Sequence, residues 1–94
     1  MKSTEYEWDL AKAEHNLRKH GVDFADAAVA LGDPRAMTRH DPDSNGEARY
    51  VSLGMDRTGR VLVTVFSYPG ARVRVISSRK ATRSERASYG QRYA

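Results

Sequence analysis

Basic and hydrogen-bonding side chains occur at three separated places in the sequence, and together they have the types that RNA cleavage requires. The set consists of Lys19, His20, Glu47, Arg49 and Arg79. Metal-free cleavage of an RNA phosphodiester needs a base to deprotonate the 2′-hydroxyl, cationic donors to stabilise the phosphorane, and an acid for the leaving 5′-oxygen. These five residues are therefore the candidate catalytic residues.

Individual roles within this set stay open at the level of sequence. Glu47 or His20 could act as the base, and Arg49 and Arg79 could each hold the phosphate through two parallel hydrogen bonds. A simpler explanation is that all five are surface charges on a small basic domain. On residue types alone, this simpler explanation ranks ahead of catalysis.

Positive charge is concentrated toward the end of the chain. The sequence has 16 Lys and Arg against 12 Asp and Glu, a net charge of +4. From residue 72 onward only Glu85 opposes the basic residues, which predicts attraction to a polyanion through phosphate contacts and counterion release. An acidic protein partner is the alternative. We expect the RNA-binding residues to be Lys12, Arg72, Arg74, Lys80 and Arg83.

No metal ion or other cofactor is expected from the sequence. The loop at residues 41–46 resembles the first half of an EF-hand, but Ser52 stands where the bidentate Glu is required, so we interpret the loop as an Asx-rich turn. His15 and His20 are five residues apart, which places them on different faces of a helix. There is no cysteine. Disulfides and cysteine-based zinc sites are thereby excluded.

Length and composition predict one ordinary globular domain over residues 1–94. Hydrophobic residues make up 39% and charged residues 30% of the 94 residues, which is not typical of a disordered chain. The absence of cysteine suits a reducing cytoplasm. The longest apolar run is too short for a signal peptide or a membrane span, so we expect a cytoplasmic protein without membrane contact.

The elements that must position these side chains begin with two helices. Asp9 is a good N-cap and Gly21 a good C′ residue for a helix at residues 10–20. Within it, Leu10, Ala13 and Leu17 recur at helical spacing and predict a buried stripe. A second helix is expected from Asp23 until Gly32 and Pro34, with its apolar face formed by Phe24, Ala27, Ala28 and Leu31.

After Pro34 the pattern alternates, which predicts strands at residues 36–39, 49–54, 61–68 and 72–77. The third of these is apolar on both faces and is expected at the centre of the sheet. Thr82 and Glu85 form a capping box for a last helix that runs to about residue 93. The predicted fold class is α+β: two N-terminal helices, a mainly antiparallel sheet of about four strands and a short C-terminal helix, with one sheet face left uncovered.

The last helix has few aliphatic residues, so we expect part of it to contact a partner. Aromatic residues together with Arg are typical of protein interfaces. Arg86, Tyr89 and Tyr93 are the candidate partner-binding residues, with both tyrosines exposed beside the arginine. The alternative is that the tyrosines pack across the sheet.

Three ordered blocks of the sequence resemble one protein family. The first block contains Tyr6-Glu7-Trp8-Asp9, Lys12, Asn16, Lys19-His20-Gly21-Val22, Phe24, Ala27 and Asp33-Pro34. The second contains Gly46-Glu47, Arg49-Tyr50 and Gly54, and the third contains Arg74-Val75-Ile76-Ser77-Ser78-Arg79-Lys80-Ala81-Thr82, Glu85-Arg86 and Tyr89. This pattern is similar to that of the BrnT toxins and covers nearly the whole chain. Tyr6 differs from the family's usual Phe.

The resemblance implies a RelE-like fold and a metal-independent endoribonuclease that inhibits translation and growth. It also implies a BrnA-type antitoxin with a ribbon-helix-helix region, whose complex with the toxin binds operator DNA and represses the operon. DNA contact would then be indirect, through the antitoxin. The competing hypothesis is a non-catalytic basic module that binds nucleic acid or an acidic protein partner.

Overall fold

The computed structural model describes residues 4–44 and 46–91, so the predicted partner-binding residue Tyr93 lies outside the described residues. Three helices and five strands follow one another in an α+β arrangement, as predicted. In chain order they are β1 (Tyr6–Glu7), α1 (Leu10–His20), α2 (Phe24–Leu31), β2 (Met37–His40), β3 (Arg49–Met55), β4 (Val61–Ser67), β5 (Val73–Lys80) and α3 (Arg83–Gln91).

The strands form one mixed sheet in the order β1-β5-β4-β3-β2, with the apolar β4 at its centre as expected. The prediction of about four strands missed β1, which pairs parallel to β5 through only two residues. Two residues are too few to show an alternating pattern. The last strand also extends to Lys80, so Arg79 and Lys80 lie within β5 and not after it.

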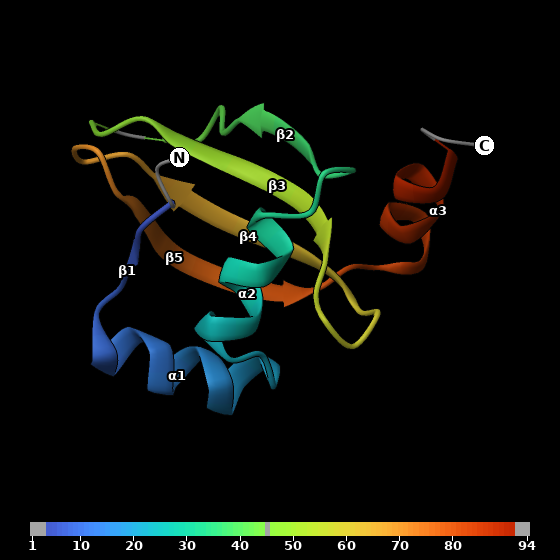
Figure 1. Cartoon of the computed structure of the whole chain (residues 1–94), viewed down its shortest axis with the longest axis horizontal. Helices are drawn as coiled ribbons and strands as arrows, with labels where there is room; N and C mark the ends of the chain where they lie inside the picture. Colours follow the sequence, from blue (N-terminus) through green and yellow to red (C-terminus); the bar gives the residue numbers. More distant parts are fainter. Residues whose placement is uncertain (1–3, 45, 92–94) are drawn as a thin grey trace.

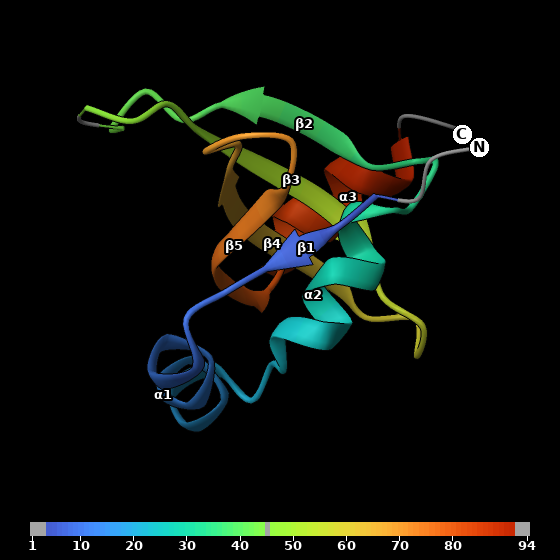
Figure 2. The same ribbon diagram turned by 60° about the vertical axis from the view of Figure 1, so that its left-hand side comes forward.

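Helices α1 and α2 lie against one face of the sheet, and α3 lies apart from them at the end of the sheet where β5 finishes (Figures 1 and 2). On the covered face, Phe24 of α2 packs with Val75 of β5, and Ala30 packs with Leu62 of β4. Gly54 of β3 allows α2 to pack close to the sheet, because a Cβ atom at this position would lie 2.3 Å from the Ala30 carbonyl oxygen. The opposite face is left uncovered by α1 and α2.

The predicted buried stripe of α1 is wrong at both leucines, although Ala13 is partly buried and packs against the core. Leu10 is 76% exposed and Leu17 is 47% exposed, whereas the buried residue of this helix is the polar Asn16. The reason is that α1 packs beside the part of β5 that β1 does not pair, and such a strand edge presents backbone N–H and C=O groups. A polar side chain satisfies those groups and a leucine cannot.

Asn16 makes three hydrogen bonds, two of which fix α1 to β5. Its amide nitrogen donates to the carbonyl oxygens of Val22 at 3.0 Å and Ser78 at 2.8 Å, and its side-chain oxygen accepts from the Ser78 backbone N–H at 3.1 Å. The Ser78 hydroxyl forms a hydrogen bond of 3.0 Å with the Thr64 hydroxyl of β4, so the attachment continues into the sheet. Asn16 is 4% exposed, which makes these bonds costly to lose.

The expectation that Tyr89 is exposed is also wrong. Tyr89 of α3 is 8% exposed and packs with Val61, Val63 and Ala81, and its hydroxyl donates a hydrogen bond to Asp33. Because α3 has few aliphatic side chains, this ring supplies the apolar surface that attaches the helix to the sheet. Arg86 is exposed, as expected, although its guanidinium donates to the Ala81 carbonyl oxygen at 3.0 Å.

Among the described residues, no helix combines the length and hydrophobicity that crossing a bilayer requires.

Replacing Asn16 by Leu should lower the free energy of unfolding by about 2–5 kcal/mol. The variant keeps a similar volume but leaves buried backbone groups of Ser78 and Val22 without partners, and each such group costs about 1–3 kcal/mol. Urea denaturation measures the change. Arg18→Gln is the control on the same helix, with an exposed side chain and an expected change below about 0.5 kcal/mol. A loss below 1 kcal/mol for Asn16→Leu would contradict the structural role of these bonds.

Candidate active site

A pocket of about 600 Å³ lies on the sheet face that α1 and α2 leave uncovered. Its floor consists of aliphatic side chains from the two central strands, Val51 and Leu53 of β3 and Val63 and Val65 of β4. Val51, Leu53 and Val65 are only partly buried, so apolar surface remains open to the pocket. We refer to this cavity as the sheet pocket.

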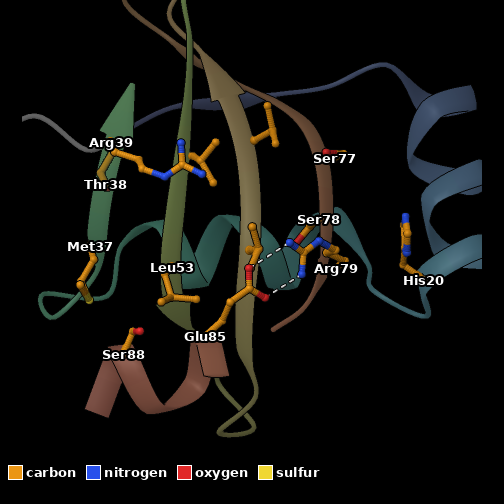
Figure 3. Close-up of a pocket in the computed structure, with 13 residues that line it drawn as sticks. His20, Met37, Thr38, Arg39, Leu53, Ser77, Ser78, Arg79, Glu85 and Ser88 are labelled. Carbon is orange, nitrogen blue, oxygen red and sulfur yellow. Dashed lines mark hydrogen bonds and ion pairs between the residues drawn. The ribbon is translucent and has the colours of Figure 1, made fainter. Parts of the chain in front are cut away.

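Polar residues form opposite walls of the sheet pocket (Figure 3). On one side are His20, at the end of α1, and Ser77 and Arg79 of β5; on the other side is Arg39 of β2. The remaining polar lining residues are Thr38 of β2, Ser78 of β5, and Glu85 and Ser88 of α3. The walls thus come from four elements that are far apart in the sequence.

Strand register orders these residues across the sheet. Arg79 lies opposite Val63, which lies opposite Leu53 and then Met37. On the neighbouring level the order is Ser77, Val65, Val51 and Arg39. The two arginines therefore stand on opposite sides of the aliphatic floor, on adjacent levels.

Arg79 is held by a bidentate ion pair with Glu85. Its Nη1 donates to one carboxylate oxygen at 2.8 Å and its Nη2 to the other at 3.0 Å. Hydrogen bonds from Arg79, followed by the backbone N–H of Thr82, lower the pKa of Glu85 from 4.5 to about 2. The same carboxylate raises the pKa of Arg79. Glu85 is consequently an anion at neutral pH and too weak a base to remove a proton from a hydroxyl.

Glu85 also belongs to the predicted capping box, which is confirmed. Its carboxylate accepts from the Thr82 backbone N–H at 2.7 Å, and its own N–H donates to the Thr82 hydroxyl at 3.2 Å. One carboxylate therefore both begins α3 and orients the Arg79 guanidinium in the sheet pocket.

A second hollow of about 220 Å³ lies beside the sheet pocket along α1. His20 and Ser77 line both cavities, and the second is also lined by Lys12, Lys19 and His15. We refer to it as the α1 hollow. Cationic side chains thus continue from the sheet pocket along the first helix.

The structure brings only part of the predicted catalytic set together. His20 and Arg79 line the sheet pocket and Lys19 lines the α1 hollow. Glu47 and Arg49 are exposed and line neither cavity. Glu47 lies in the loop before β3, and Arg49 is the first residue of β3. Arg49 is two residues before Val51, which puts it on the same face of the sheet beyond the end of the sheet pocket.

Most predicted RNA-binding residues lie outside the sheet pocket. Arg72 pairs with Glu5 at 2.9 Å and Arg74 with Glu7 at 3.1 Å, so acidic partners from the segment around β1 neutralise them locally. Lys80 and Arg83 are exposed and do not line the sheet pocket. Lys12 lines the α1 hollow.

Arg39, Glu85 and Ser88 line the sheet pocket but were absent from the predicted set. The alternation of Met37 and Arg39 indicated that both share one face of a strand, but not which face is uncovered. Glu85 was visible only as a helix-capping residue. Groups of three or more His, Asp or Glu residues that could hold a metal ion are not found in residues 4–44 and 46–91.

Comparisons with known proteins agree on one family. A family model described as "Ribonuclease toxin, BrnT, of type II toxin-antitoxin system" matches residues 8–85. The fold is similar to the crystal structure of the Brucella abortus ribonuclease toxin BrnT, with a TM-score of 0.64 and 26% sequence identity. That match covers 86% of this chain and 100% of the Brucella chain. No curated protein matches the sequence.

Glu85→Gln should reduce the pH dependence of stability in acid. Because the folded pKa of about 2 lies below the ordinary 4.5, Glu85 stabilises the fold above pH 4.5, and this contribution is lost as the pH falls toward 2. Urea unfolding at pH 7 and pH 3 should show a smaller difference for the variant than for the wild type. Glu14→Gln, at an exposed position of α1, is the control and should keep the wild-type difference. An unchanged difference in Glu85→Gln would contradict the pKa shift.

Proposed function

Because this chain belongs to the BrnT family of ribonuclease toxins from type II toxin-antitoxin systems, we propose that it cleaves RNA in the sheet pocket without a metal ion. One observation carries the placement of the reaction. His20 from α1 and Arg79 from β5, both predicted from the sequence as catalytic, line the same cavity. An imidazole and a guanidinium are the groups that metal-free phosphodiester cleavage uses for proton transfer and for charge stabilisation.

In the proposed reaction, the His20 imidazole accepts the proton of the 2′-hydroxyl, whose oxygen attacks the adjacent phosphorus. The bond to the 5′-oxygen breaks, leaving a 2′,3′-cyclic phosphate, and the leaving oxygen takes up a proton from water. Imidazole suits the first step since histidine is the side chain that ordinarily changes its charge near neutral pH. Glu47 was the alternative base, and its place in the exposed loop before β3 favours His20.

Arg79 stabilises the charge of the phosphorane in this proposal. An Arg side chain has five N–H donors. Two of them bind Glu85 and a third donates to the Lys80 carbonyl oxygen. Among the described residues, no group binds the N–H of Nε or the second N–H of Nη2, and these two point from the same edge of the guanidinium. That edge can bind two phosphate oxygens in parallel while Glu85 keeps the group in place.

Binding of the RNA outside the sheet pocket is assigned to the surrounding cations. Lys12 and Lys19 continue the positive surface along the α1 hollow, and Arg49 continues it along the same face of β3. Such residues contact phosphates without reading sequence. Lys80 and Arg83 stay in the proposal as more distant contacts, whereas the acidic partners of Arg72 and Arg74 weaken their attraction for RNA.

We also propose that a BrnA-type antitoxin with a ribbon-helix-helix region neutralises the chain, and that their complex binds operator DNA through the antitoxin. The family description supports an antitoxin partner. The exposed Arg86 of α3 remains a candidate contact, while the buried Tyr89 would act only by holding α3 in position.

Purified protein should cleave RNA in the presence of excess EDTA, and His20→Ala and Arg79→Ala should each lower the rate by roughly ten- to ten-thousandfold. Gel analysis of a defined RNA with mapped ends measures the rate. Arg18→Gln, which removes a charge on the side of α1 opposite Asn16, should cleave normally. Loss of cleavage on chelation would contradict the metal-free mechanism. Salt-sensitive binding of RNA that stays intact would favour the non-catalytic module.

Expression in bacterial cells should arrest growth, and co-expression of the neighbouring open reading frame should restore it. Growth measurements and recovery of a complex of the two proteins test both parts. Cells that express His20→Ala should grow normally, because the variant lacks the proposed base. The variant should still bind the neighbouring protein, because its fold is intact. Harmless expression of folded wild-type protein would overturn the toxin proposal.

A further inference from the structure

We propose that Arg39 is a second phosphate-binding residue of the sheet pocket, so that single-stranded RNA crosses the sheet from β5 to β2. This inference rests on the proposed function and extends it to the direction of the substrate. Arg39 was not among the residues predicted from the sequence to contact RNA. The argument uses its position, its lack of a carboxylate partner and the surface between it and Arg79.

Arg39 stands at the far wall of the sheet pocket. It lies in β2, the strand at the opposite end of the sheet from β1, and pairs with Val51. Figure 3 shows its side chain reaching from β2 over the neighbouring strand toward the middle of the cavity. Three strand spacings separate β2 from β5, which is roughly 14 Å between the two strands, and Arg39 and Arg79 are also displaced by one level along them. Phosphates on the two sides of a nucleotide segment could therefore be bound separately.

The charge of Arg39 is not neutralised by any described residue. Among the ion pairs formed within residues 4–44 and 46–91, Arg60, Arg72, Arg74 and Arg79 each have a carboxylate partner and Arg39 has none. Within the described part of the chain, its guanidinium donates one hydrogen bond, to the His40 carbonyl oxygen, and at 3.5 Å this bond is long and therefore weak. An exposed guanidinium with donors still available, at the wall of a cavity, is suited to binding an anion.

The floor between the two arginines favours RNA over a simple anion. Val51 and Val65 lie between Arg39 and Ser77 on one level of the sheet, and both keep part of their apolar surface open. Cationic walls and an aliphatic floor complement single-stranded RNA, whose phosphates are charged and whose bases have apolar faces. In a duplex the base faces are stacked and covered, so the floor selects unpaired nucleotides.

The test separates binding from cleavage by using an RNA oligonucleotide that carries 2′-O-methyl groups and therefore lacks the attacking hydroxyl. Fluorescence anisotropy over a range of salt concentrations gives its Kd. Arg39→Gln should raise the Kd about tenfold and lower the slope of log Kd against log salt by about 0.7, the contribution of one phosphate contact to a single strand. Arg18→Gln is the control, because it makes the same substitution at another exposed position, and it should bind the oligonucleotide like the wild type.

A second measurement places Arg39 away from the reacting phosphate. With cleavable RNA, Arg39→Gln should raise KM about tenfold and change kcat less than twofold, whereas Arg79→Gln should mainly lower kcat. Urea unfolding should show that Arg39→Gln is as stable as the wild type, since the side chain is exposed.

Different negative results would contradict different proposals. Equal Kd values for Arg39→Gln and Arg18→Gln, or no binding of the oligonucleotide by the wild type, would overturn the role of Arg39. Weaker binding of the antitoxin with unchanged binding of RNA would also overturn it, and would assign Arg39 to the protein partner. Wild-type binding of the oligonucleotide without cleavage of ordinary RNA would overturn only the proposed ribonuclease function.

Discussion

The attachment of α1 to the open edge of β5 through Asn16 is the interaction on which the candidate site depends. One buried amide satisfies both backbone groups of Ser78 and the carbonyl of Val22, where the chain turns toward α2. His20 lies four residues beyond Asn16 on the same helix, so the register of α1 against β5 decides whether the imidazole faces the sheet pocket. A directional contact gives a more exact register than apolar packing would, because only one arrangement satisfies every donor and acceptor.

The second constraint comes from the other end of the chain and acts on Arg79. Glu85 is shared between the first turn of α3 and the guanidinium, and Tyr89 holds that helix against the end of the sheet. The sheet pocket is therefore assembled from a polar attachment on one side and a capped helix on the other, above a floor of aliphatic side chains. His20 and Arg79 are thus positioned by groups, Asn16 and Glu85, that do not themselves take part in the proposed chemistry.

The local elements could be predicted from sequence because each has a local signal: Asp9 and Gly21 bound α1, and the capping box marks α3. Burial depended on tertiary partners that local patterns do not reveal. Leu10 and Leu17 followed the helical period but face outward, since the surface that α1 meets is a polar strand edge. The same limit explains why Arg39 was missed, because no periodicity tells which strand face stays uncovered. Glu47 was included for its residue type, and no local pattern shows that the loop before β3 lies away from the sheet pocket.

The order of these residues along the chain gives the shared carboxylate a further consequence. His20 and Arg79 both precede Glu85, so the part of the chain before α3 contains both proposed reacting groups but not the carboxylate that anchors the guanidinium. The cavity takes its final form only when α3 is in place, because Glu85 and Ser88 of that helix line it. A chain that stops after Lys80 would thus contain His20 and Arg79 but would lack the carboxylate that orients the guanidinium.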